Sequence, residues 1–141
     1  MPLRTVHHPP GIHTAQQKQQ FSAHITGFHT RFGKLPAFYV VTVFQEIDAD
    51  SLHVGGEPTA AAVRIMADHM AVHTEDAETR KRSREILARI LAPHTTDRGL
   101  YCEFHIDETP RELWMLDGLA PPPLTSEAHR LWGRENRPVP H

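Results

Sequence analysis

Alternation of apolar and polar residues opens the chain and soon gives way to a helical spacing. Residues 2–7 alternate loosely and end at a His-Pro-Pro-Gly turn signal, which predicts a short strand. Within residues 14–32, apolar side chains recur at spacings of four, three and four, with Thr14 as a candidate N-cap and Gly33 just past the end. The spacing predicts a helix with one aromatic-rich face, formed by Phe21, Ile25, Phe28 and Phe32.

A run of β-branched and aromatic residues follows this helix. It extends from Ala37 to Ile47, begins after Pro36 and ends at an Asp-Ala-Asp turn, so we expect a buried strand. A strand, a helix and a second strand in this order form a βαβ unit, and its crossover makes the two strands parallel.

The same pattern returns in the second half of the chain. Residues 51–56 suit a small hairpin arm, and residues 61–70 alternate as a strand with one buried and one polar face. Residues 75–91 carry a helical apolar stripe, and residues 100–106 form a fourth strand. A second βαβ unit is therefore predicted.

These elements predict an α/β (α+β) fold in which two βαβ units pack as one domain over residues 1–141. The first unit covers about residues 1–58 and the second about residues 59–108. A Pro-rich tail of short helical turns covers residues 109–141.

Composition and charge limit the classes of partner that we expect the protein to bind. The net charge is −2 and the pI is near 6.6, so we expect neither nucleic acid nor a membrane surface as a partner. The longest strongly apolar run, residues 37–44, is far shorter than the ~20 residues that span a bilayer. Cys102 is the only cysteine and has no partner for an internal disulfide. We predict a cytoplasmic protein.

Pro2 offers the most specific chemistry. An initiator Met before a residue as small as proline is usually removed, which would leave a secondary amine at the terminus. An α-amino group titrates near ~7.7–8.0, so a desolvated one among cations can act as a general base or nucleophile at neutral pH. The alternative is that Pro2 merely opens an edge strand.

Six segments spread over nearly the whole chain carry a family resemblance. They are Met-Pro-Leu-Arg-Thr at the start, AHITGFH at 23–29, GKLPAFYVV at 33–41, DETPRELW at 107–114, GLAPPP at 118–123 and ENRPVP at 135–140. With these segments the chain resembles the tautomerase superfamily and, within it, the branch of cis-3-chloroacrylic acid dehalogenase and its fungal homologues. The resemblance implies a tandem β-α-β tautomerase fold, a homotrimer, and an amino-terminal proline that acts as general acid or base in a pocket.

Several positions depart from the dehalogenase pattern. The two arginines that clamp the substrate carboxylate correspond here to Met70 and His73. The tyrosine of the fourth strand corresponds to His105, and the water-activating glutamate corresponds to Leu116, beside Asp117. Loss of both the clamp and the acid argues against efficient hydrolytic dehalogenation.

Arg64 is the candidate replacement for the missing arginines, because it lies on the polar face of its predicted strand. The alternative is a solvated arginine on an exposed sheet face. The resemblance also places His29 where the dehalogenases hold a substrate-binding histidine. The candidate catalytic residues are Pro2, His29, Arg64 and His105. The candidate substrate-binding residues are Tyr39, His73, Trp114 and Asp117, although packing of the tail is an alternative role for Trp114.

His69 and His73 are the candidate pair of metal ligands. Two histidines four residues apart suit zinc if they share a helix face. However, His69 closes a predicted strand and no carboxylate or thiol lies nearby at ligand spacing, so we expect no metal and no cofactor.

The sequence therefore predicts a proline-based tautomerase or isomerase for a small enolisable carbonyl or carboxylate compound, with Pro2 as general acid or base. Weak hydratase or dehalogenase activity is compatible with this prediction. Two alternatives stay open: a biosynthetic isomerase or lyase for a larger neutral substrate, and a catalytically silent member with a binding role. The expected partners are a small-molecule substrate and two further copies of the chain.

Overall fold

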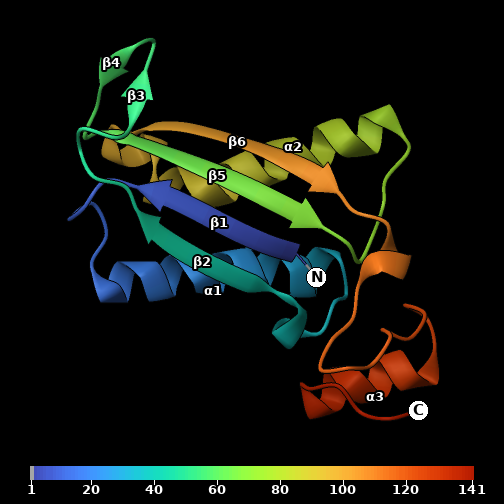
Figure 1. Cartoon of the computed structure of the whole chain (residues 1–141). Helices are drawn as coiled ribbons and strands as arrows, with labels where there is room; N and C mark the ends of the chain where they lie inside the picture. Colours follow the sequence, from blue (N-terminus) through green and yellow to red (C-terminus); the bar gives the residue numbers. More distant parts are fainter. Residues whose placement is uncertain (1) are drawn as a thin grey trace.

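The computed structural model describes residues 2–141, and its centre is a four-stranded sheet in the order β2-β1-β5-β6. Both long helices cover one face of this sheet, and the C-terminal segment lies beyond one end of it (Figure 1). The main elements are β1 (Pro2–His8), α1 (Ala15–Phe32), β2 (Val41–Glu46), β5 (Ala62–His69), α2 (Ala77–Leu91), β6 (Tyr101–Glu108) and α3 (Glu127–Glu135). The shorter ones are η1 (Ala37–Tyr39), β3 (His53–Val54), β4 (Glu57–Pro58), η2 (Ala92–His94), η3 (Thr96–Arg98) and η4 (Arg111–Leu113).

The pairing of the strands confirms the two predicted βαβ units. β1 pairs with β2 in parallel, and β5 pairs with β6 in parallel. The two units join through β1 and β5, which run antiparallel with Pro2 opposite His69. As a result, β1 begins at the same edge of the sheet at which β5 and β6 end.

Local signals set the helix boundaries. The Thr14 side chain accepts a hydrogen bond from the backbone N–H of Gln17, whose side chain accepts in return from the backbone N–H of Thr14, so α1 begins where predicted. α2 begins at Ala77, because Asp76 is its N-cap and accepts a hydrogen bond from the backbone N–H of Thr79. The main core lies between these helices and the sheet, and contains Val6, Phe21, Ile25, Val63, Ile65, Leu87 and Leu91.

The prediction of a buried strand from Ala37 to Ile47 is wrong in two respects. Residues Ala37–Tyr39 form a 3₁₀ turn, so that β2 begins only at Val41. β2 also lies at the edge of the sheet, and Val41 and Val43 are 38% and 45% exposed. Helices cover only one face, so alternate residues of every strand point away from the core.

The tail forms a second, smaller core. Tyr39, Trp114 and Trp132 pack there with Leu35 and Ala71. The indole N–H of Trp132 donates to the backbone carbonyl of Val139 at 2.6 Å. The two tryptophans therefore anchor the C-terminal turns onto the βαβ framework. Within residues 2–141, no helix combines the length and apolarity that a bilayer crossing requires.

Candidate active site

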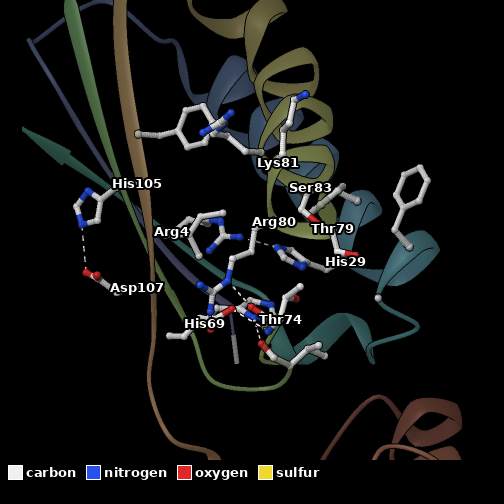
Figure 2. Close-up of a pocket in the computed structure, with 18 of the residues that line it drawn as sticks. Arg4, His29, His69, Thr74, Thr79, Arg80, Lys81, Ser83, His105 and Asp107 are labelled. Carbon is white, nitrogen blue, oxygen red and sulfur yellow. Dashed lines mark hydrogen bonds and ion pairs between the residues drawn. The ribbon is translucent and has the colours of Figure 1, made fainter. Parts of the chain in front are cut away.

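A cavity of about 920 Å³ opens at the edge of the sheet where β1 begins (Figure 2). Its floor is the helix-facing side of β1, β5 and β6, and its walls are the end of α1 and the start of α2. The lining includes the apolar side chains of Phe28, Phe32, Leu35, Val72 and Phe104. Because α1 and α2 pack side by side over the sheet, this end of the helix layer is where a ligand can enter.

Arg4 lies at the inner end of the cavity. Alternation along β1 turns Pro2, Arg4 and Val6 toward the helices, and only 1% of Arg4 is exposed. One guanidinium nitrogen, Nη2, lies 3.0 Å from Nε2 of His29. Arginine is a donor only, so His29 accepts this hydrogen bond and carries its own proton on Nδ1.

The remaining guanidinium nitrogens of Arg4, Nε and Nη1, have no hydrogen-bond partner within residues 2–141. Burial lowers the pKa of Arg4 to about 10, while the nearby charge of Asp68 opposes the shift. The side chain is therefore still a cation at neutral pH, but a desolvated one.

Two neutral imidazoles stand beside this cation. Burial, with the charge of Arg4 adding to it, lowers the pKa of His29 to about 2. Burial also lowers the pKa of His69 to about 4, although a hydrogen bond to Val72 opposes the shift. The two rings stack with centroids 5.5 Å apart and planes inclined by 26°. Both histidines are therefore uncharged at neutral pH.

The tautomer of His69 is fixed by the chain that follows it. Its Nδ1–H donates to the backbone carbonyl of Val72 at 2.6 Å, so Nε2 keeps a free electron pair. His69 lines the cavity and is the strand partner of Pro2. A basic nitrogen thus lies one strand away from the residue that opens β1.

Positive charge gathers at the rim of the cavity. Arg80 donates to the backbone carbonyl of Thr74 and pairs with Glu108 at 3.4 Å. Lys81 and Arg84 extend the same side of α2 along the opening. The rim therefore favours the approach of anions.

The structure does not bring Arg64 to this cavity. Arg64 lies on the sheet face away from the helices, where its Nη2 donates to Nδ1 of His105 at 2.7 Å. Nε2–H of His105 donates in turn to Asp107 at 3.1 Å. His105 and Asp107 reach the rim, but their side chains lie on the other side of β6 from Arg4 (Figure 2).

The four candidate substrate-binding residues lie outside the lining of the cavity. Tyr39 and Trp114 are buried in the second core, where burial raises the pKa of Tyr39 to about 12. His73 is exposed and its Nε2–H donates to the backbone carbonyl of Thr109 at 2.6 Å. Asp117 is exposed in a tight turn with Gly118, at a φ of 49°. Of the predicted catalytic residues, His29 and His105 are part of the cavity lining, whereas Pro2 is not in that lining and is the strand partner of His69, which is.

The fold and the cavity can now be compared with known proteins. The model of a family described as "Putative oxalocrotonate tautomerase enzyme" matches residues 1–137. The chain belongs to the Tautomerase_3 family. The resemblance to the tautomerase superfamily is thereby confirmed.

Solved structures of similar chains agree with this membership. RhCC from Rhodococcus jostii RHA1 is 39% identical with a TM-score of 0.95, and the match covers 99% of both chains. A probable enzyme from Aspergillus fumigatus is 35% identical with a TM-score of 0.93, covering 100% of this chain and 98% of that one. N1, a member of the cis-3-chloroacrylic acid dehalogenase family, shares the fold at 19% identity and a TM-score of 0.73, covering 95% and 97%. A search of curated proteins gave no match.

The two histidines considered for zinc have separate tasks in this Tautomerase_3 chain. His69 ends β5 and bonds to Val72, whereas His73 lies in the following loop and bonds to Thr109. In the described part of the chain, no three His, Cys, Asp or Glu side chains are arranged to hold a metal ion.

Sequence reasoning missed Arg4 and underestimated His69. A signal for Arg4 was present, because it lies two residues after Pro2 and so shares the face of the strand that Pro2 occupies. An arginine at an inward position of a strand is rarely fully buried without a partner, and is for that reason a candidate functional residue of this Tautomerase_3 chain.

Proposed function

We propose that this chain is a proline-based tautomerase acting on a small enolisable carbonyl or carboxylate compound, with Pro2 as general acid and base. The observation that carries the proposal is that two histidines held neutral by burial, His29 and His69, line the cavity, and that His69 is the strand partner of Pro2, which opens β1. Membership of the Tautomerase_3 family supports the same reaction class.

The proton transfers follow from the groups present. Once Met1 is removed, Pro2 has a secondary amine, and the nearby Arg4 cation favours its neutral, basic form. The amine removes a proton from the carbon next to a carbonyl: the C–H bond breaks, an N–H bond forms, and the electron pair moves into the enolate. In the reverse direction the prolyl ammonium returns the proton to carbon.

The oxygen of the substrate needs a partner in both directions. The free electron pair on Nε2 of His69 can accept the enol O–H proton as the carbon is protonated, and can return it later. A neutral imidazole suits this exchange, because it need not first lose a charge. His29 instead holds the Arg4 side chain through its Nε2.

Hydrolytic dehalogenation is not supported by the same residues. Met70 carries no charge, His73 is bonded to the backbone of Thr109, and Leu116 packs against the second core. None of them supplies a guanidinium clamp or an acid that activates water.

We therefore expect ketonisation of an enol, with chloride release that is slow or absent. The processed protein is assayed with phenylenolpyruvate and a 2-hydroxydienoate by absorbance, and with cis-3-chloroacrylate by chloride measurement. Chloride release at a rate comparable to ketonisation would refute the argument about the missing clamp. Failure to turn over any enol would favour the catalytically silent alternative.

We also propose that the chain is a homotrimer. The sheet face away from the helices exposes Val43, Met66 and Tyr101 by 45%, 38% and 52%. Apolar side chains on an uncovered sheet face are typical of a contact between subunits. Multi-angle light scattering is expected to give three times the chain mass of 16.0 kDa. A single 16.0 kDa species at micromolar concentration would contradict the proposal.

A further inference from the structure

We propose that Arg4 is the carboxylate-binding residue of the cavity, and that the substrates are carboxylic acids with an apolar body. The inference rests on the proposed function, since it names the substrate class of the same site. Arg4, not Arg64, is then the residue that takes over from the missing arginine clamp.

The first step is that burial of the Arg4 cation destabilises the folded protein. Arg4 is 1% exposed, and no carboxylate within residues 2–141 forms an ion pair with it. Asp68 raises its pKa by its charge alone, because it sits opposite Leu3, on the other face of the sheet. A desolvated charge without a counter-ion destabilises a protein, so a ligand that supplies the negative charge gains from this arrangement.

The second step concerns the shape of the ligand group. His29 occupies only Nη2, so the N–H of Nε and both N–H of Nη1 lack an acceptor within residues 2–141. A planar guanidinium with several free donors matches the two oxygens of a carboxylate. His29 and His69 are neutral and therefore do not compete with Arg4 for the negative charge.

The third step is the route. Arg4 is part of the cavity lining although only 1% of it is exposed, so a carboxylate reaches it through the cavity and not from the outer surface. Arg80, Lys81 and Arg84 at the rim attract the anion on its way in.

The volume and lining of the cavity also limit the size and polarity of the part of the substrate that carries the carboxylate. About 920 Å³ is more than a three-carbon acid fills, and lies in the range of pockets that hold molecules of drug size. Phe28, Leu35 and Phe104 contribute apolar side chains to the same lining as Arg4. An acid with an aromatic ring or a branched chain a few bonds from its carboxylate suits both the charge and the apolar lining.

The test uses two probes that the protein cannot enolise readily. 3-Phenylpropanoate and 3-phenylpropanamide have the same apolar body and differ in charge. Titration calorimetry at pH 7.5 is expected to show that the wild-type protein binds the acid at least ~10-fold more tightly than the amide, as a charge-assisted pair requires. Equal or tighter binding of the amide would overturn the inference without any variant.

Three variants test which residue causes the preference for the acid over the amide. In Arg4→Met the preference for the acid is expected to disappear, and in Arg4→Lys to be reduced, because the planar fork is lost. Arg89→Met, which removes an exposed arginine of α2 outside this cavity, is expected to keep it. A preference retained in folded Arg4→Met, or lost in Arg89→Met, would contradict the role of Arg4. If Arg4→Met does not fold, Arg4→Lys and the two wild-type titrations still decide.

The outcomes separate this inference from the proposed function. Binding of the acid that depends on Arg4, in a protein that ketonises no enol, leaves the inference standing and removes the function. Ketonisation of an enol acid with an unchanged KM in Arg4→Met leaves the function standing and removes the inference.

Discussion

A free amine on Pro2 is expected to raise kcat/KM for ketonisation of an enol acid by about 10²–10⁴-fold over a preparation that retains Met1, the range of general acid–base catalysis. With Met1 in place, the nitrogen of Pro2 is a tertiary amide that neither accepts nor donates a proton at neutral pH. The other bases at the cavity, His29 and His69, have pKa values of about 2 and about 4, and so hold no proton to give to carbon at pH 7.

The measurement compares two fractions of one protein whose Met1 content is known from intact mass. Thermal melting of both fractions serves as the control for folding. Pro2→Ala is expected to keep part of the activity after processing, since it retains a primary amine. Equal turnover by the two fractions would exclude Pro2 as the acid–base group.

Acid is expected to destabilise the protein progressively as the pH falls below 6.5. The pKa of His29 and that of His69 are lowered from 6.5 to about 2 and about 4 in the folded state. Between these values and pH 6.5 the unfolded chain binds more protons, so stability is complete above pH 6.5 and falls as the pH falls. At pH 5 each histidine would cost up to about 2 kcal/mol, a large share of the roughly 5–15 kcal/mol that stabilises a domain.

Urea unfolding at pH 7.5 and at pH 5.0 measures this effect. His13, His94 and His129 shift in the same direction, mainly because of burial, and add to the loss. His29→Gln is expected to flatten the pH dependence, whereas His53→Gln, in the exposed β3–β4 hairpin, leaves it unchanged. An unfolding free energy that is equal at both pH values would contradict the buried neutral state of these rings.

Local rules explain why so much of the fold could be predicted. The capping box formed by Thr14 and Gln17 spans only four residues, and α1 begins where this motif predicts. Likewise, alternation in residues 61–70 correctly separates Val63, Ile65 and Ala67, which are buried, from Arg64 on the other face. Such patterns depend on a residue and its near neighbours alone.

The sequence could not show which face of the sheet the helices cover, or which strands lie at its edge. An apolar run such as Val41–Glu46 looks the same at the centre and at the edge of a sheet. For the same reason sequence reasoning points to Arg64 and misses Arg4: which of the two lies in a cavity depends on which face the helices cover, and this is decided by packing between distant segments. His29 was found because the family resemblance supplied its position, while Arg4 becomes visible only when its burial is known.

The antiparallel junction between β1 and β5 gives the chain an approximate twofold axis, and the axis has a consequence for the number of sites. The second βαβ unit has an equivalent sheet edge, where β5 begins and β1 ends. There, however, Ala62 continues from the β3–β4 hairpin, so no amine can be released. That edge is filled instead, by His8 and His13 with ring centroids 5.4 Å apart and by Phe21 stacked on His94 at 4.4 Å. Within residues 2–141, the sheet edge where β1 begins is therefore hollowed by the cavity, whereas aromatic side chains pack at its counterpart.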